Sequence, residues 1–306
     1  MAARVSRLVV VTRKTPLELL LERFGTHGQA KFYLATRGQT IEPQEKLHQR
    51  LTRGLTDVLR ELPPDQKYAR VDRDDLDRFL FAPDDVIVMV GQDGLVPNVA
   101  KYLRGQLAIG INPDPANYDG VLCRFPPAAT RTLLGFAADV AATGAPFRIE
   151  ERTMASAMRE DGQRLLALNE IFVGHRTHQS ARYRITTGKD TERHSSSGLI
   201  CATGTGATGW ARSIAEQRKI EEMLPTPDEP RLAWFVREPF PSVATGTSLS
   251  SGSVYRSESL VVHSEMGEGG TLFADGIESD RVEFADGQTV TIGIAEERLR
   301  LVVPVA

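Results

Sequence analysis

The chain has 306 residues, 41% of them hydrophobic and 25% charged, and its 37 Lys and Arg against 40 Asp and Glu give a formal net charge of −3. This length suits about two globular domains, and the composition excludes a disordered, collagen-like or coiled-coil protein. A nearly neutral chain has no electrostatic footprint for DNA or RNA, so we expect no nucleic-acid partner. No apolar run approaches the roughly 20 residues of a membrane helix. Two cysteines fit a reducing compartment, and we expect a cytoplasmic protein with no membrane partner.

The first part of the chain alternates strand and helix patterns. Thr15 and Pro16 form a good helix start, as N-cap and first helical residue. An acidic run at 72–77 lacks the spacing of a calcium loop and indicates another helix start. Strands are expected at 8–11, 30–35, 86–90 and 107–111, and helices at 16–24, 41–62, 96–104 and 128–143. Strands separated by helices predict a Rossmann-like α/β domain with a parallel sheet, which we assign to residues 1–144.

The pattern changes after the breaker cluster at 144–146. Short alternating segments, separated by turn-forming residues, lie at 167–173, 181–187, 198–202, 232–236, 259–263, 281–284, 289–294 and 298–303. One helix, at about 207–223, interrupts them. This pattern predicts an all-β, sandwich-like second domain over 145–306, with the option that its last strand returns to the first domain.

The most informative motif follows the apolar strand at 86–90. Gly91, Gln92, Asp93 and Gly94 stand between that strand and a helix. In a parallel sheet this places them at the carboxyl end of a strand, where open α/β folds bind ligands. The glycines allow close approach of a ligand, and Asp93 is a candidate to accept a proton from a hydroxyl nucleophile or to hold magnesium. A capped strand-to-helix turn is the alternative.

A second candidate is a Gly/Thr-rich loop between a strand and a helix. Its residues are Thr203, Gly204, Thr205, Gly206, Thr208 and Gly209. They formally match a dinucleotide fingerprint, but they lie in the β-rich half, outside a βαβ unit, so we reject a second Rossmann site. Such a loop still offers amides and hydroxyls to a phosphate or a ribose, and a plain connection is the alternative.

Weaker candidates lie elsewhere in the second half. Asn169 and Glu170 follow an apolar strand and suit a polar ligand, although an exposed strand end is the commoner explanation. The pair His175 and His178 has no further ligands nearby in sequence and favours a solvated loop over a metal site. Asp275, followed by glycine, fits a hairpin turn.

Together these stretches resemble the NAD kinase family and its superfamily, which includes diacylglycerol and sphingosine kinases. The family carries Gly-Gly-Asp-Gly, then Gly-Ile-Asn, an Asn-Glu or Asn-Asp pair, and a Thr-rich loop after Asp-Gly-Leu-Ile. The counterparts here, in the same order, are 91–94, 110–112, 169–170 and 197–210, and Asp275-Gly276 resembles a late Asp-Gly of the family. The likeness spans residues 86–276, most of the chain.

The resemblance implies an enzyme with its active site between an α/β and a β domain, one that phosphorylates the 2′-hydroxyl of the adenosine ribose of NAD with ATP. Asp93 would be the catalytic base. Gly91, Gln92, Gly94 and Asn112 would bind phosphates or nucleotide. The acceptor NAD would contact Asn169, Glu170, Thr203, Thr205, Gly206 and Thr208. Magnesium would be bound by the ATP phosphates and have no protein site of its own. Members of the family commonly form homo-oligomers, so the resemblance also implies a homo-oligomer.

The chain departs from the family pattern at several positions. Gln92 replaces a glycine, Ser197 replaces an acidic residue, and Trp210 replaces a tyrosine. Loss of the carboxylate at 197 bears most directly on recognition of NAD. Two alternatives therefore stay open: a related phosphotransferase acting on a sugar, nucleoside or lipid hydroxyl, and a non-catalytic nucleotide-binding protein. ATP and polyphosphate, and NAD and NADH, are not distinguished.

Overall fold

The computed structural model describes residues 5–141 and 144–305, and it divides into two compact units. Unit 1 comprises the chain up to Glu150 and returns from Arg300 onward. Unit 2 comprises Glu151–Leu299. Two long strands, β5 (Phe147–Arg159) and β16 (Thr289–Pro304), carry the chain from one unit to the other.

The sheet of unit 1 is parallel, in the order β2-β1-β3-β4, and the end of β16 pairs in parallel with β4. Its strands are β1 (Arg7–Thr12), β2 (Tyr68–Asp72), β3 (Asp85–Val90) and β4 (Leu107–Ile111). Every residue of β3 and β4 is buried, which explains the apolar runs at 86–90 and 107–111. Asp85, the buried first residue of β3, pairs with Arg7. The carboxyl ends of β1 and β3 lie side by side, with Val11 paired to Met89.

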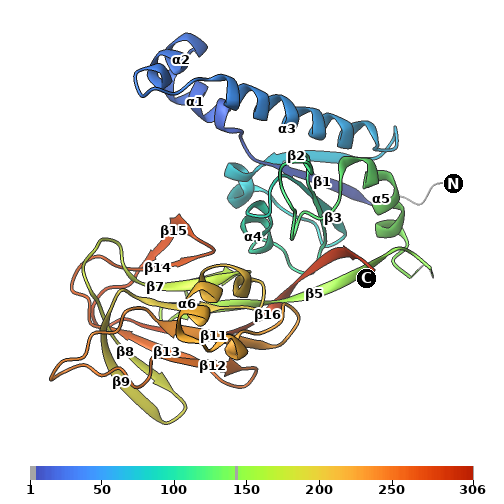
Figure 1. The fold of residues 1–306 in the computed structure, drawn as a ribbon. Coiled ribbons are helices and arrows are strands. Elements are labelled where there is room, and N and C mark those ends of the chain that lie inside the picture. Colours follow the sequence, from blue (N-terminus) through green and yellow to red (C-terminus); the bar gives the residue numbers. More distant parts are fainter. Residues whose placement is uncertain (1–4, 142–143, 306) are drawn as a thin grey trace. The chain divides into compact units, whose positions relative to one another are not determined.

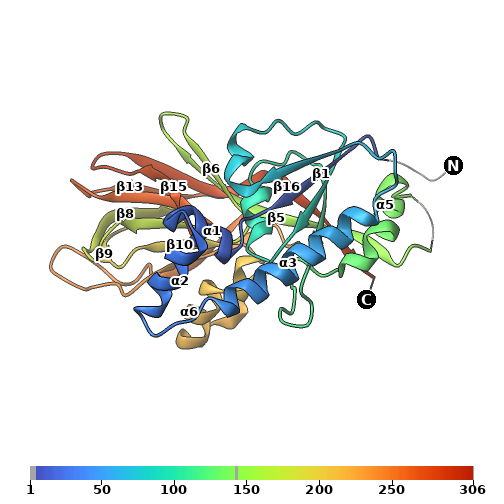
Figure 2. The ribbon, with the colours of Figure 1, turned by 90° about the horizontal axis from the view of Figure 1, so that it is seen from above.

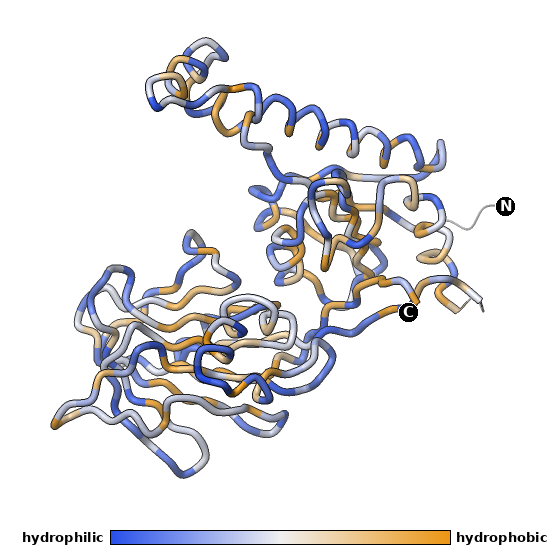
Figure 3. Tube along the Cα trace, in the orientation of Figure 1, coloured by the Kyte–Doolittle hydropathy of each residue, from blue (hydrophilic) through white to orange (hydrophobic). Residues whose placement is uncertain are grey.

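Helices cover both sides of this sheet, and Figure 1 shows α3 and α4 on opposite sides of β1 and β3. The helical elements are α1 (Pro16–Phe24), α2 (His27–Ala35), α3 (Glu42–Arg60), η1 (Arg73–Arg78), α4 (Leu95–Ala100), η2 (Pro127–Ala129) and α5 (Thr130–Ala138). Helices α3 and α5 share one apolar cluster with the sheet, through Val58 and Leu133 among others. Hydropathy along α3 alternates between an apolar inner side and a hydrophilic outer side (Figure 3).

The strand predicted at 30–35 is wrong, because this segment forms α2. Thr26 caps the helix by accepting a hydrogen bond from the amide of Gln29. Ala30 and Leu34, one turn apart, are buried in a small cluster with α1 and the start of α3. Helix α2 lies next to α1 in both views (Figures 1 and 2). Tertiary packing of this i, i+4 pair decides the structure of a segment whose composition suits either state.

Other differences in unit 1 concern an edge strand and helix lengths. No sequence pattern indicated β2, in which only Val71 is buried, because an exposed edge strand lacks the apolar run that reveals β3. The helix predicted at 96–104 is the shorter α4, and α5 replaces the longer helix predicted at 128–143, whose last two residues lie outside the described residues. The helix start predicted at 72–77 is the 3₁₀ helix η1, capped by Asp72.

Unit 2 consists of antiparallel strands in two layers. One six-stranded sheet has the order β12 (Ser251–Tyr255), β11 (Arg231–Val236), β10 (Leu199–Ala202), β7 (Glu170–His175), β14 (Gly270–Ala274), β15 (Ile277–Glu283). The other layer contains β16, β13 (Leu260–Ser264), β8 (Ala181–Thr187) and β9 (Asp190–Ser196), with the hairpin of β5 and β6 (Arg164–Ala167) beside β16.

One core cluster joins the two layers of unit 2 and includes Trp234 from the first and Tyr183 from the second. The short helices are η3 (Gly206–Thr208), α6 (Trp210–Arg218) and η4 (Glu221–Met223), which replace the single helix predicted at 207–223. The strands predicted at 289–294 and 298–303 are one continuous strand, β16. The predicted combination of an α/β unit and a sandwich-like β unit is confirmed. None of the described helices is both long and apolar enough to span a bilayer.

Candidate functional site

The loop of Gly91, Gln92, Asp93 and Gly94 presents backbone amides at the carboxyl end of β3. The amide of Leu95, the first residue of α4, donates to the carbonyl of Gln92 and is not available to a ligand. In the described ranges, the amides of Gln92, Asp93 and Gly94 donate to no other protein group. Successive amide donors in a turn are groups to which an anion can bind.

The carboxylate of Asp93 is held by the loop at 121–123. It accepts hydrogen bonds from the amides of Val121 at 2.7 Å, Leu122 at 2.8 Å and Cys123 at 2.8 Å. A carboxylate offers about four acceptor positions, so these three contacts leave roughly one for a substrate hydroxyl. Asp93 therefore fixes this loop as well as facing the turn, a role that the sequence did not indicate.

Asn112 is buried and shapes the turn that follows β4. Its amide nitrogen donates to the carbonyl of Tyr118 at 2.7 Å, and its side-chain oxygen accepts from the amide of Asp114 at 3.0 Å. Both ends of the side chain are thus engaged by the protein. Asn112 lies outside the pocket that Gly91 and Gln92 line, so its predicted contact with a nucleotide stays a prediction.

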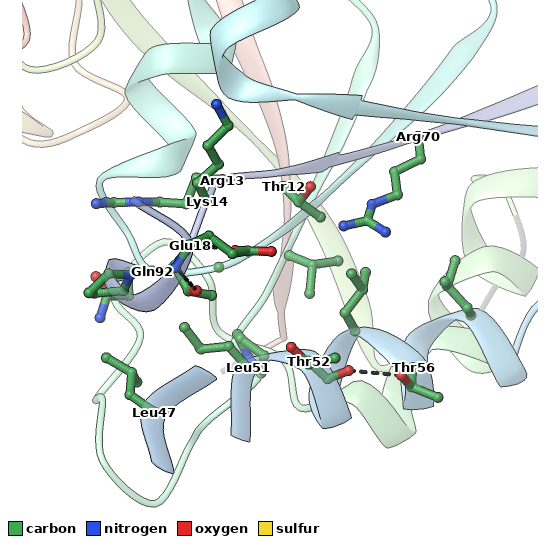
Figure 4. A pocket seen from close by; sticks show the side chains of 17 residues that line it. Thr12, Arg13, Lys14, Glu18, Leu47, Leu51, Thr52, Thr56, Arg70 and Gln92 are labelled. Atoms are coloured by element: carbon green, nitrogen blue, oxygen red, sulfur yellow. Dashed lines mark hydrogen bonds between the residues drawn. The ribbon is translucent and has the colours of Figure 1, made fainter. Parts of the chain in front are cut away.

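A pocket of about 290 Å³ lies beside this turn within unit 1 (Figure 4). Its wall combines the end of β1, the start of α1, one side of α3 and the Gly91-Gln92 pair. The α3 side presents four half-buried leucines at intervals of four residues: Leu47, Leu51, Leu55 and Leu59. A pocket with an apolar wall and a few polar groups is the usual form of a small-molecule site.

Basic side chains border the pocket, and none of them belongs to a motif that was recognised in the sequence. Arg13 and Lys14 follow β1, and Arg70 belongs to the edge strand β2. Lys14 is engaged by Glu22 at 2.7 Å and Asp74 at 3.7 Å. Arg13 makes no ion pair among the described residues. The sequence did contain a signal for them: Arg13 and Lys14 stand between the buried strand β1 and the helix start at Thr15-Pro16. The carboxyl end of β1 lies beside that of β3, which leads into the turn at 91–94.

In unit 2, Asp275 holds the segment that contains Asn169 and Glu170. Its carboxylate accepts from the amides of Leu168 at 3.0 Å, Asn169 at 2.6 Å and Glu170 at 3.3 Å. Asp275 and Gly276 form the two-residue turn between β14 and β15, with φ values of 55° and 70°. Positive φ at both positions defines the hairpin turn that Asp-Gly favours. The same turn therefore places a carboxylate against a neighbouring strand.

The Gly/Thr-rich loop packs directly on that segment. The amide of Thr203 donates to the carbonyl of Asn169 at 2.8 Å, and the Thr203 hydroxyl donates to the carbonyl of Leu168. A Cβ on Gly206 would lie 2.2 Å from the Asn169 carbonyl, so only glycine permits this approach. The structure thus brings together Asn169, Glu170, Thr203 and Gly206, which the sequence assigned to one acceptor site.

The threonine hydroxyls of the loop serve the protein itself. Thr205 accepts a hydrogen bond from the buried guanidinium of Arg152 at 3.2 Å, and the Thr208 hydroxyl donates to the Thr205 carbonyl at 3.0 Å. These contacts fix the loop conformation. The predicted contacts of Thr205 and Thr208 with an acceptor stay predictions.

Asn169 and Glu170 differ from these threonines in the hydrogen bonding of their side chains. In the part of the chain that the structure describes, neither side chain hydrogen-bonds another protein group. Burial, and then the charge of Asp275, raise the pKa of Glu170 to about 7. Glu170 is therefore a half-buried acid that exchanges its proton near neutral pH.

The departures from the family pattern have different surroundings. Gln92 lines the pocket of unit 1, and Ser197 is exposed. Trp210 stacks on Phe172, with ring centroids 5.8 Å apart, and carries the guanidinium of Arg237 4.6 Å from its ring centre. Trp210 thus has a packing role on α6.

The histidine pair does not form a metal site in this structure. His175 contacts the Glu268 carbonyl through Nε2 at 2.9 Å and accepts the Thr177 amide at Nδ1, so both ring nitrogens are engaged. Among the described residues, no group of three or more His, Cys, Asp or Glu could hold a metal ion. Burial raises the pKa of Cys201 to about 12, which makes it an inert core thiol.

Comparison with known proteins gives matches along almost the whole chain, although no protein-family profile matches it. The chain is 24% identical to NAD kinase 2, mitochondrial, of Rattus norvegicus, covering 98% of this chain and 88% of the rat protein. The Homo sapiens protein of the same name is also 24% identical, with 98% of this chain and 84% of that protein covered. The predicted resemblance to the NAD kinase family is confirmed.

Solved structures agree in fold with this NAD kinase resemblance. An NAD kinase from Archaeoglobus fulgidus, solved with ATP, has a TM-score of 0.58 at 21% identity and covers 98% of this chain and 93% of its own. A yeast NADH kinase, solved with NADH, has a TM-score of 0.60 at 14% identity and covers 99% of this chain and 84% of its own. At these identities the likeness establishes the two-domain architecture.

Proposed function

We propose that this protein is an ATP-dependent kinase that phosphorylates the 2′-hydroxyl of the adenosine ribose of NAD. The observation that carries the proposal is the turn at 91–94. Among the described residues, its amides at 92–94 donate to no protein group, it contains the carboxylate of Asp93, and its Gly91 and Gln92 line a pocket with a basic border. The relatives named NAD kinase support a phosphotransferase with a hydroxyl acceptor. Phosphoryl transfer depends mainly on positioning and charge neutralisation, which this arrangement supplies.

Unit 1 would bind the phosphate donor. The amides of Gln92, Asp93 and Gly94 would hold phosphate oxygens, and Arg13 would neutralise part of their charge. Asp93 would use its remaining acceptor position to take the proton of the attacking hydroxyl. The likeness to a kinase solved with ATP supports ATP as the donor. A magnesium ion would be carried by the ATP phosphates, with no dedicated set of protein ligands.

Unit 2 would supply the acceptor contacts. Asn169 and Glu170 offer open polar side chains, held in place by Asp275 and by the loop at 203–208. An amide and a carboxyl group can hydrogen-bond ribose hydroxyls and the amino group of adenine. NADH is a second acceptor to test, because one structural neighbour is a kinase solved with NADH.

The direct test measures NADP formation by the purified full chain with NAD, ATP and magnesium, alongside NADH, a nucleoside, a sugar and a diacylglycerol as acceptors. We expect multiple turnovers with NAD or NADH. Turnover with another acceptor alone would establish the alternative phosphotransferase, which the exposed Ser197 motivates. Nucleotide binding without turnover on any acceptor would contradict both. Homo-oligomerisation and a cytoplasmic location remain predictions, and the rat and human relatives are named as mitochondrial.

A further inference from the structure

One acidic residue, Glu18, lines the otherwise basic pocket of unit 1. Glu18 occupies the first turn of α1 and forms a capping box with Thr15, whose amide donates to its carboxylate at 2.7 Å. Figure 4 shows this carboxylate turned into the pocket, with Gln92 at one end of the cavity and Arg70 at the other. The cap uses only part of the acceptor capacity of a carboxylate, so Glu18 can accept further hydrogen bonds from a ligand.

Glu18 is kept ionised by its surroundings. Burial opposes its charged form, but the hydrogen bonds from Thr15 and the nearby charges of His48 and Arg70 outweigh burial and lower the pKa of Glu18 below its ordinary value. A carboxylate in this state only accepts hydrogen bonds. It would repel a phosphate placed beside it, so the middle of the pocket is unsuited to the anionic part of a donor.

The size and the apolar wall of the pocket indicate what lies there instead. About 290 Å³ is at the lower end of small-molecule sites, which span roughly 300–1,000 Å³. This space suits one ring system, with the phosphates at the part of the pocket rim formed by Arg13, Gly91 and Gln92. The leucines of α3 offer a surface on which a flat ring can pack, and Arg70 adds hydrogen-bond donors beyond Glu18.

We propose that Glu18 and Arg70 select the base of the phosphate donor, with Glu18 accepting from the exocyclic amino group of adenine and Arg70 donating to a ring nitrogen. Adenine presents this donor next to an acceptor. Hypoxanthine presents a carbonyl oxygen where adenine has its amino group and would leave Glu18 without a partner. Polyphosphate has no ring to pack on the leucines and places negative charge near Glu18. This inference rests on the proposed function, because it assumes that the pocket holds the donor.

The test compares binding of ADP and IDP to the full chain by calorimetry, which requires no turnover. We expect the wild type to bind ADP at least about tenfold more tightly than IDP, because a site built to hydrogen-bond an amino group rejects a ligand that lacks it. Glu18→Gln keeps an oxygen for the cap and turns an amide donor toward the base. We expect it to abolish or reverse the preference for ADP.

Two further variants secure the interpretation. Glu45→Gln changes a residue of α3 that lies outside the pocket and contacts His27 of α2, and it should leave the ADP/IDP ratio unchanged. Arg70→Gln does not touch the cap and should weaken ADP binding about fivefold to tenfold, so the inference is testable even if Glu18→Gln fails to fold. Equal affinity of the wild type for ADP and IDP, an unchanged ADP/IDP ratio in Glu18→Gln, or an unchanged affinity of Arg70→Gln for ADP would overturn it. A Glu18-dependent preference without NADP formation would uphold base selection and refute only the proposed function.

Discussion

Each of the two units contains an aspartate whose carboxylate accepts hydrogen bonds from three successive backbone amides, but the two aspartates have different surroundings. In unit 1 the carboxylate of Asp93 accepts three backbone amides from the loop at 121–123, and in unit 2 the carboxylate of Asp275 accepts three from 168–170. Each aspartate is followed by glycine. Asp93 follows a buried parallel strand, in a turn whose Gly91 and Gln92 line a pocket, whereas Asp275 forms a hairpin turn at positive φ.

This comparison shows that an Asp-Gly pair gains its role from what surrounds it. In the described part of the chain, the amides of Gln92, Asp93 and Gly94 donate to no protein group and so suit an anion, and the three amides that the Asp93 carboxylate accepts leave it roughly one acceptor position. The turn of Asp275 instead fixes the backbone of Asn169 and Glu170, the residues proposed to contact the acceptor. We therefore propose that Asp93 takes part in the chemistry and that Asp275 positions the acceptor site.

The largest effect is expected for Asp93→Asn. Asparagine removes the base and places an amide donor against backbone donors, so we expect kcat for NADP formation to fall by at least about 100-fold. Asp119→Asn is the matched control and should retain activity, because Asp119 is an exposed residue just before the segment 121–123 that contacts Asp93. Near-normal turnover in a folded Asp93 variant would exclude its catalytic role.

A smaller effect is expected for Asp275→Asn. Asparagine tolerates the positive φ of this turn, so the change removes the charge-assisted hydrogen bonds to 168–170 without straining the backbone. We expect a loss of about 2–3 kcal/mol in the free energy of unfolding and a higher KM for NAD with a modest change in kcat. Asp286→Asn alters the exposed Asp-Gly turn at 286–287 and should do neither. A kcat loss as large as that of Asp93→Asn would remove the distinction between the two aspartates.

Glu170 predicts a pH dependence specific to unit 2. Its folded pKa of about 7 lies above the ordinary value of 4.5, so the folded state holds the proton more tightly than the unfolded state does. Stability from this group is present below about pH 4.5 and is lost as the pH rises to about 7, by at most about 3 kcal/mol. Glu170→Gln should therefore be more stable than the wild type at pH 8 and similar to it at pH 4.5.

Urea unfolding at the two pH values measures this difference, with Glu160→Gln as an exposed control on the same unit. Asp275→Asn should also lower the pKa of Glu170, because it removes the neighbouring negative charge. A pH-independent difference between wild type and Glu170→Gln would show that Glu170 titrates as an ordinary surface acid.

The smallest effect is expected for Thr15→Ala, which removes the capping box of α1 beside the pocket. We expect a loss of about 1 kcal/mol and a fall in Tm of a few degrees. Thr26→Ala removes the corresponding cap of α2, away from the pocket, with a similar loss. Only the Thr15 variant should also raise KM for ATP. An equal rise in KM for ATP in both variants would contradict the proposal that the pocket beside Thr15 binds the donor.

The sequence predicted most strongly what local pattern determines. The buried strands β3 and β4 and the capped helix α1 follow from apolar runs and from Thr15-Pro16. Helix α2 and the edge strand β2 were missed because their state depends on neighbours, namely the packing of Ala30 and Leu34 on α1 and the pairing of β2 with β1. Such contacts leave little periodicity in the sequence.

The candidate site was predicted in part for the same reason. Motif order identified the turn around Asp93 and grouped Asn169 with the loop around Thr203, which the structure brings into contact. Arg13 and Glu18 were missed, because pocket lining depends on which strand ends are neighbours in the sheet. The hydrogen bonds of Asp93 and of Asp275, each to three backbone amides, join segments far apart in the chain. No local sequence pattern predicts such contacts.

The central claim is that unit 1 binds the donor and unit 2 binds the acceptor, and steady-state kinetics of Arg13→Gln and Asn169→Ala tests it most directly. We predict that Arg13→Gln raises KM for ATP about tenfold with little change in KM for NAD, because an ion pair with a phosphate is lost. Asn169→Ala should raise KM for NAD and leave KM for ATP nearly unchanged. If both variants raised the same KM, or if their effects were exchanged, the assignment of donor and acceptor to the two units would be wrong.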